Sequence, residues 1–388
     1  MKSIIPYGKQ DISLSDIKSV VKALKADLIT QGPATKLFES AISSYCNSKY
    51  TILFNSATSA LHLACLALDI KKNDIVWTSP ITFVASANCA LYCGAKVNFI
   101  DIDALTFNIC IKKLEDKLIF AKGTGTLPKL IIAVHMAGQS CDMRSLKKLS
   151  KKYGFKIIED ASHAIGGKYL KKPIGNCLYS DITIFSFHPV KIITTGEGGA
   201  ALTNKKYLAQ KMALLRSHGI TRDIKLMSKK NMGSWYYEQI ELGYNYRMTD
   251  FQAALGLSQL GRIDDFVMKR NLLAKRYNVM FKDLPIKPQV VTKENYSSYH
   301  LYIIRLDLTK IKKSHFEVFQ FLKNGGVEVN LHYFPVYLQP YYKKLGFKLG
   351  LCPEAENYYK EAISLPLFYK LSLTQQKYIY KLLKKALE

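Results

Sequence analysis

Lys191 is the residue whose surroundings most clearly suggest chemistry. It lies between an apolar stretch, residues 182–187, and a turn that contains Gly196, Gly198 and Gly199. A lysine held in an apolar pocket has a lowered pKa, and its neutral amine can form an imine with an aldehyde. Most lysines of such a lysine-rich chain are solvated surface charges. The interpretation therefore depends on whether the rest of the chain encodes a site for an aldehyde cofactor.

A candidate phosphate site lies in residues 55–64, where small and hydroxylated residues join an expected strand to an expected helix. Bare backbone N–H groups and the Thr58 hydroxyl would point from the N-terminus of that helix, which suits a phosphate monoester. Serine or threonine before a helix more often serves only as a cap. The Ser186 hydroxyl, at the end of the expected strand before Lys191, could bind the same phosphate.

Asp160 ends an apolar run, where a carboxylate is costly unless it meets a positive partner. A protonated pyridine nitrogen would be such a partner, and the pair would keep the ring an electron sink. Asp160 could equally cap the turn that follows it. His163 could lie against the ring or could be a loop histidine satisfied by backbone groups. Phe83 could stack on a flat ring, although an isolated aromatic residue more often belongs to the core.

These features occur along the chain in the order that pyridoxal phosphate requires. A phosphate site at Thr58 is followed by a stacking aromatic at Phe83, an acid for the pyridine nitrogen at Asp160, and an imine lysine at Lys191. Each signal is weak by itself, but the ordered set is strong. The sequence therefore predicts a pyridoxal-phosphate enzyme.

The elements that must position these residues alternate between short apolar runs and amphipathic stretches over the first 205 residues. This alternation predicts an α/β fold with a mostly parallel sheet and ligands bound beyond the carboxyl ends of the strands. The expected helices are 57–68, 83–93 and 143–153. The expected strands are 50–54, 74–78, 96–100, 130–134, 156–159, 182–187 and 200–203.

The pattern changes at Asp250. One long helix is expected over residues 250–281, followed by Pro285, Pro288 and an alternating strand over residues 301–308. We place a domain boundary between residues 245 and 265. The prediction is a large cofactor-binding domain with an N-terminal arm over residues 1–250, and a smaller C-terminal α+β domain over residues 251–388.

The formal charge of +26 raises the possibility of a nucleic-acid, membrane or phosphorylated partner. The basic residues are scattered as Lys-Lys pairs and form no aromatic-interleaved block, so we expect no nucleic acid and a negatively charged substrate. Residues 51–68 and 77–95 carry no charge, but turn signals divide each into a strand and a helix, so no membrane span is predicted.

The eight cysteines lie mostly in apolar surroundings. Cys89 and Cys93 are the one close pair and have no second pair to complete a zinc site, so no metal is expected. Reduced, buried thiols are typical of a cytoplasmic protein. The first residues contain no apolar core of a secretory signal, which agrees with that location.

With these motifs established, the chain resembles the DegT/DnrJ/EryC1/StrS sugar aminotransferases, pyridoxal-phosphate enzymes of fold type I, along nearly its whole length. The segments that carry the resemblance are residues 28–32, 55–61, 159–164, 186–200, 216–219 and 243–250. Within the family it is most similar to the branch that aminates C4 of a UDP-linked 4-keto-6-deoxy-N-acetylhexosamine, with glutamate as the usual donor, in pseudaminic acid biosynthesis. That closer similarity rests on residues 55–60, 192–195, 332–337 and 362–366.

The resemblance implies a role for each matching residue. Lys191 is the imine lysine and proton shuttle, Asp160 pairs with the pyridine nitrogen, and His163 contacts the ring near its 3-hydroxyl. The phosphate is held by Ala57, Thr58 and Ser186, and by Asn245 of a second subunit, which makes the active site composite and the homodimer obligatory. Candidates for the nucleotide-sugar side are Tyr7, Thr30, Gly32, Arg247, His332 and Tyr333.

Three alternatives stay open. The family's dehydratase branch carries a histidine in place of the lysine, so Lys191 argues against it. Another nucleotide-sugar aminotransferase, acting at C3 or C4 of a dTDP- or GDP-linked sugar, fits the same motifs. A non-catalytic regulator or nucleic-acid binder that kept the fold would have no need for both Lys191 and Asp160. The sugar stereochemistry depends on pocket shape, which no single motif encodes.

Overall fold

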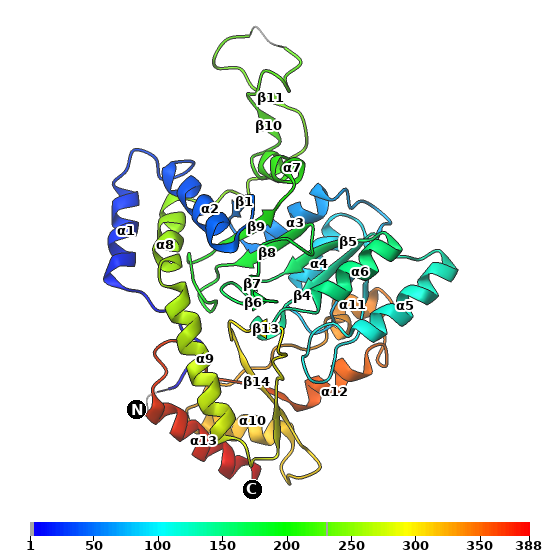
Figure 1. The fold of residues 1–388 in the computed structure, drawn as a ribbon, viewed down its shortest axis with the longest axis vertical. Coiled ribbons are helices and arrows are strands. Elements are labelled where there is room, and N and C mark those ends of the chain that lie inside the picture. The colour runs from blue at the N-terminus through cyan, green and yellow to red at the C-terminus, as the bar shows by residue number, and fades with distance from the viewer. Residues whose placement is uncertain (1–3, 230–231) are drawn as a thin grey trace.

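A mixed seven-stranded sheet forms the centre of the larger part of the molecule (Figure 1). The computed structural model describes residues 4–229 and 232–388, so part of the N-terminal segment considered above as a secretory signal lies outside the described residues. All neighbouring strands are parallel except at β9, which is antiparallel to both of its neighbours. The predicted mostly parallel sheet is confirmed. In spatial order the strands are β1 (Tyr50–Phe54), β9 (Gly199–Thr203), β8 (Ile182–Ser186), β5 (Lys156–Asp160), β4 (Leu130–Val134), β2 (Ile75–Thr78) and β3 (Lys96–Phe99).

Helices cover both faces of this sheet because its central strands are apolar on both sides. Ile132 and Ile184 face one core, with α3 (Ala57–Ala67), α4 (Ala85–Tyr92) and α7 (Lys206–Arg216). Residues one position away face the opposite side: Ile131 packs with α5 (Ile111–Thr124) and α6 (Met143–Tyr153), and Phe185 packs with α2 (Pro33–Cys46). The result is a three-layer α/β/α architecture.

A second, antiparallel sheet lies toward the C-terminus. It contains β12 (Ile286–Pro288), β14 (Tyr302–Leu306) and β15 (Ala362–Leu365), in that spatial order. Its core includes residues from α9 (Ile263–Met280), α10 (His315–Asn324) and α13 (Leu373–Leu387). Ile5 of the N-terminal segment pairs with Val327 and enters the same core. The expected strand near 301–308 is present as β14, and the exact division at residue 250 stays a prediction.

Shorter elements complete the fold. A small three-stranded sheet, in the order β13-β6-β7, joins a loop of the larger part to the chain after α9. Strands β10 and β11 form a projecting hairpin (Figure 1). Their bounds, with those of the remaining helices, are α1 (Leu14–Leu24), β6 (Lys168–Tyr169), β7 (Lys172–Pro173), β10 (Ile220–Thr221), β11 (Glu238–Gln239), β13 (Asn295–Tyr296), α11 (Pro340–Lys344) and α12 (Pro353–Glu361).

The prediction of one helix over residues 250–281 is wrong. The chain forms α8 (Asp250–Leu260) and α9, separated by Gly261 and Arg262. Arg262 has φ −114° and ψ 7°, and its guanidinium contacts Asp11 at 2.8 Å and the buried Asp16 at 2.6 Å. The periodicity of apolar residues continues across the break, so the local sequence does not reveal it. The break is fixed by ion pairs to the N-terminal segment.

The two uncharged stretches fold as expected, since β1 leads into α3 and β2 is followed by α4. Among the helices of residues 4–229 and 232–388, none combines the length and the apolar composition needed to cross a bilayer. The same residues contain no group of three or more His, Cys, Asp or Glu side chains arranged to hold a metal ion.

Helix α8 provides a test of this packing. A Cβ on Gly256 would collide with the ring of the fully buried Phe38 of α2, so Gly256→Ala is expected to destabilise the protein by about 1–3 kcal/mol through overpacking. Gly123→Ala is the matched control, because Gly123 lies in α5 with no atom within 4 Å of the added Cβ. The control is expected to stabilise by about 0.5–1 kcal/mol through helix propensity. Urea unfolding midpoints measure both, and equal shifts in the two variants would contradict the packing account.

Candidate active site

A cavity of about 590 Å³ opens at the carboxyl ends of the parallel strands. Asp160 is the last residue of β5, Ser186 is the last of β8, and Ser56 lies between β1 and α3, immediately before the helix. This edge of the sheet is where a parallel fold is expected to bind its ligand. The cavity wall brings together most of the predicted site residues: Tyr7, Ala57, Thr58, Phe83, Asp160, His163, Ser186, Lys191, His332 and Tyr333.

The remaining predicted residues lie outside the wall of this cavity: Thr30, Gly32, Asn245 and Arg247. The backbone of Thr30 pairs with Thr249, and the Gly32 N–H donates to the Asp250 carboxylate at 3.0 Å. A side chain at Gly32 would collide with that carboxylate, so packing alone explains the glycine. Asn245 is exposed and its backbone pairs with Ser217. The roles assigned to these residues stay predictions.

The start of α3 has the form of an anion site. Ser56, in an extended conformation, caps the helix by accepting the Ser59 N–H at 3.1 Å, so the capping role belongs to Ser56 and not to Thr58. The N–H groups of Ala57 and Thr58 have no partner within the helix because they belong to its first turn. A Cβ on Gly199 would lie 2.5 Å from the Ala57 nitrogen, so only glycine lets β9 approach so closely. These amides border the cavity and suit a phosphate.

Asp160 is nearly buried, with 5% of its surface exposed, and hydroxyl groups bind both of its oxygens. Ser86 donates to Oδ2 at 2.6 Å, while Ser162 donates through its hydroxyl to Oδ1 at 2.6 Å and through its backbone N–H at 3.2 Å. Asp160 therefore caps its turn and lines the cavity at once. Within the described residues no basic side chain forms an ion pair with it, which leaves the carboxylate available to a cationic ligand.

Lys191 reaches the same cavity from the chain after β8. Burial lowers the pKa of its amine from 10.5 to about 8, and the nearby Asp160 opposes that change only in part. The Lys191 side chain is half-buried and lines the cavity. The amine is therefore neutral in a minor fraction of molecules near physiological pH, a far larger fraction than for an ordinary lysine, and the neutral form is the one that acts as a nucleophile or base.

His163 is held as one neutral tautomer. Its Nδ1 accepts the Ala137 N–H at 3.3 Å, so the proton of the neutral ring lies on Nε2, which is 3.3 Å from the Tyr333 hydroxyl. Burial, with Lys191 and His332 nearby, holds the pKa of His163 well below its usual range. Ala137 adopts φ 60°, a left-handed conformation that aims its N–H at the ring. The ring is therefore a hydrogen-bond donor toward Tyr333.

Several residues of the site were missed from sequence. Ser86 and Ser162 bind Asp160, and His300 lies 3.4 Å from the Lys191 amine. Asn330 and Glu197 also line the cavity. Ser162 lies inside a recognised motif and its spacing from Asp160 is a signal for a turn contact. Ser86 and His300 carry no comparable signal, because they come from separate elements.

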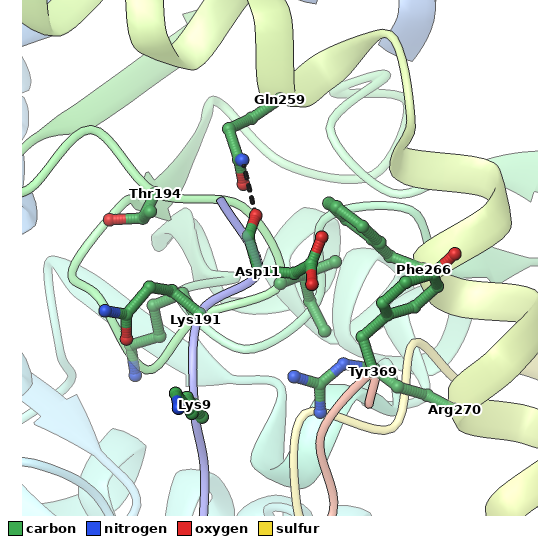
Figure 2. A pocket seen from close by; sticks show the side chains of 10 residues that line it. Lys9, Asp11, Lys191, Thr194, Gln259, Phe266, Arg270 and Tyr369 are labelled. Carbon is green, nitrogen blue, oxygen red and sulfur yellow. Dashed lines mark hydrogen bonds between the residues drawn. The ribbon is translucent and has the colours of Figure 1, made fainter. Parts of the chain in front are cut away.

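Behind Lys191 lies a second, much smaller cavity of about 10 Å³, which Figure 2 shows between Lys191 and Arg270. The N-terminal segment crosses it, and the Gln259 side chain donates to the Asp11 carbonyl at 2.9 Å. A space of this size holds about one water molecule. Of the two cavities beside Lys191, only the larger has room for a cofactor and a substrate.

Comparison with known proteins decides the family. The DegT/DnrJ/EryC1/StrS aminotransferase family matches residues 10–384. The chain belongs to this family. Its cofactor is pyridoxal phosphate. A similar solved structure is the PLP form of a putative sugar aminotransferase from Streptococcus pneumoniae. The two have a TM-score of 0.88 and 32% sequence identity, with 99% of this chain and 98% of that chain covered. The predictions of an aminotransferase, of the fold type and of the cofactor are confirmed.

Relatives within the family carry more specific names. A UDP-4-amino-4,6-dideoxy-N-acetyl-beta-L-altrosamine transaminase from Campylobacter jejuni is 42% identical over 386 residues, 99% of this chain and 98% of that protein. Helicobacter pylori PseC, an aminotransferase involved in the biosynthesis of pseudoaminic acid, has a TM-score of 0.90 and 32% identity, with 99% of both chains covered.

The buried amine of Lys191 predicts a pH-dependent cost in stability for the protein freed of cofactor. Above pH 10.5 the amine is neutral in both the folded and the unfolded chain. Between pH 10.5 and about 8 only the unfolded chain binds the proton. The free energy of unfolding therefore falls as the pH falls through this range. Lys191→Met is therefore expected to be about 1–3 kcal/mol more stable than the wild type at pH 7. Urea unfolding at a series of pH values measures this gain, which should shrink toward pH 10. A gain independent of pH would show that the amine is not the cause.

Proposed function

We propose that this family member transfers an amino group from L-glutamate to C4 of a UDP-linked 4-keto-6-deoxy-N-acetylhexosamine, in the biosynthesis of pseudaminic acid. The observation that carries the proposal is the cavity in which Lys191 and Asp160 meet the predicted sugar-side residues Tyr7, His332 and Tyr333. Relatives at 42% and 40% identity over 386 residues of this chain are named as transaminases of that altrosamine derivative.

The residues of the cavity fit the cofactor. Pyridoxal phosphate, when bound, supplies an electron sink that stabilises negative charge on the carbon that exchanges its proton. The unpaired Asp160 carboxylate suits its ring nitrogen, and the amides at Ala57 and Thr58 with the Ser186 hydroxyl suit its phosphate. Phe83 borders the cavity with 59% of its surface exposed, so its ring is free to stack on a flat group.

Lys191 acts as the base. Its partly neutral amine takes the proton from the α-carbon of glutamate in one half-reaction and returns a proton to C4 of the sugar in the other. Because the amine projects from one wall of the cavity, it delivers that proton to one face of the carbon. His163 donates its Nε2 proton toward Tyr333 and so orients that hydroxyl beside the base.

A second candidate substrate is another nucleotide sugar aminated at C3 or C4, including dTDP- and GDP-linked ones. It is supported by the spore coat polysaccharide biosynthesis protein SpsC of Bacillus subtilis, which is 37% identical over 95% of this chain and 93% of that protein.

We also propose a homodimer with composite active sites, in the cytoplasm. Asn245 is exposed, its backbone pairs with Ser217 just before β10, and it does not line the cavity of its own chain; β10 and β11 form the hairpin that projects in Figure 1. Trp235 and Leu242, in the same projection, expose 78% and 81% of their surfaces, which favours contact with a second protein surface. The eight unpaired cysteines are typical of a reducing compartment.

Lys191→Ala tests the central role. Loss of the amine removes the covalent attachment point and the base, so amination of the UDP-4-keto sugar should fall by at least about 10³-fold and the absorbance band of lysine-linked cofactor should disappear. The exposed Lys72→Ala variant is the control and should keep both. Product from a panel of UDP- and dTDP-4-keto sugars, analysed for position and configuration, identifies the substrate. Lysine-linked cofactor in the Lys191→Ala protein would refute the assignment.

The composite site has its own test. Lys191→Ala and Asn245→Ala protomers are each expected to form poorly active homodimers. A mixed dimer contains one site with both changes and one intact site, so random reassembly should restore about a quarter of wild-type activity. Activity after denaturation and refolding of an equal mixture measures this gain. No gain over the average of the two separate variants would exclude sharing of the site between subunits.

A further inference from the structure

The Lys191 amine has one side-chain hydrogen-bond partner in the described structure, and no sequence motif points to that residue. The amine lies 3.4 Å from Nε2 of His300, a residue 109 positions later in the chain. His300 is 4% exposed and lines the main cavity beside Lys191. Its ring contacts that of His163, with 4.4 Å between the ring centroids.

The backbone of His300 is fixed by a buried arginine. Arg270 of α9 is 3% exposed, and its Nη1 donates to the carbonyls of Tyr299 at 3.1 Å, His300 at 3.3 Å and Leu367 at 2.9 Å. One guanidinium thus ties α9 to the chain just before β14 and just after β15. Arg270 also lines the small cavity behind Lys191 in Figure 2, so the two residues lie on either side of the same space.

The groups around the His300 ring keep it neutral. Burial lowers its pKa well below the usual range, and the charges of Lys191 and Arg270, with the neighbouring His163 and His332, act in the same direction. Asp160 and Glu197 are the acidic side chains that line the cavity, and the oxygens of Asp160 already accept hydroxyl hydrogen bonds. A neutral ring can accept a hydrogen bond through Nε2, and the lysine amine is always able to donate one.

We infer that His300 is a positioning residue for Lys191: its Nε2 accepts a hydrogen bond from the lysine amine and holds that amine against one wall of the cavity. The inference rests on the proposed role of Lys191 as the base. The free amine of Lys191 is the form that must carry the proton, and an unrestrained lysine side chain would lose side-chain entropy at each proton transfer. A fixed acceptor removes much of that freedom beforehand.

The hydrogen bond also affects the protonation of the amine. An ammonium group donates a stronger hydrogen bond than a neutral amine, so the acceptor stabilises the charged form and opposes the desolvation of Lys191. Loss of the acceptor should therefore lower the pKa of the Lys191 amine further, while loss of positioning slows proton transfer. A purely structural role of the ring predicts neither change in pKa nor rescue by another acceptor.

Two variants of equal side-chain length separate these roles. His300→Gln keeps an acceptor at about the reach of Nε2, whereas His300→Met fills similar space with a thioether, which accepts hydrogen bonds weakly. Both are studied as holoenzymes with near-ultraviolet circular dichroism as the criterion of folding. His300→Asn, with a shorter polar side chain, replaces His300→Met if the latter does not fold. His315→Phe is the control, since His315 binds the Ala362 carbonyl in the C-terminal part of the chain.

Two readouts are needed. The first is the single-turnover rate with saturating glutamate, which should fall about 10- to 100-fold in His300→Met and much less in His300→Gln. The second uses enzyme carrying pyridoxamine phosphate, in which Lys191 is free. There the pH dependence of Lys191 acetylation by acetic anhydride, read by peptide mass spectrometry, should have a lower midpoint in His300→Met than in the wild type or His300→Gln.

Each outcome decides the question. Wild-type rates in both variants, or equal loss in both with an unchanged labelling midpoint, would overturn the inference and leave His300 a packing residue. Failure of the proposed function itself would appear differently, as lysine-linked cofactor that survives Lys191→Ala. His315→Phe should match the wild type in both readouts, and a shifted midpoint in that control would also overturn the inference.

Discussion

Desolvation of an amine and a carboxylate at one edge of a parallel sheet is the constraint on which the site depends. Lys191 and Asp160 both line the cavity, yet no ion pair joins them within the described residues. Burial leaves the amine with a pKa of about 8, and two serine hydroxyls bind the carboxylate in place of a cation. A direct ion pair would have consumed both groups. Their separation keeps one available as a base and the other as an anion for the cofactor ring.

The sheet supplies this separation because Asp160 and Ser186 end adjacent strands whose directions are parallel. Each of those strands is a short apolar run that can be recognised from its own residues. The sequence was therefore sufficient to predict the strands, the residues at their carboxyl ends and the edge of the sheet at which a ligand is expected. The anion site at α3 followed for the same reason. The sequence left open which residue caps the helix, and the structure assigns the cap to Ser56, which adopts the extended conformation.

What sequence could not predict depends on contacts between distant segments. The break between α8 and α9 is fixed by Arg262 and two aspartates of the N-terminal segment, and no local periodicity records it. Ser86 reaches Asp160 across 74 positions, and His300 reaches Lys191 across 109. Serine and histidine are common in loops and helix ends without any function. Only the fold distinguishes these two from the many others.

The C-terminal part of the chain contributes side chains to the cavity and fixes the position of one of them. Arg270 binds carbonyls of two chain segments at one end of the small antiparallel sheet, and the segment before β14 carries His300 to the Lys191 amine. His332 and Tyr333 enter the cavity from the same part of the chain. Any shift of this sheet relative to the parallel one moves the acceptor of the base and the sugar-side residues together. In the proposed function, positioning of the proton donor and of the sugar carbon is thus linked through one buried guanidinium.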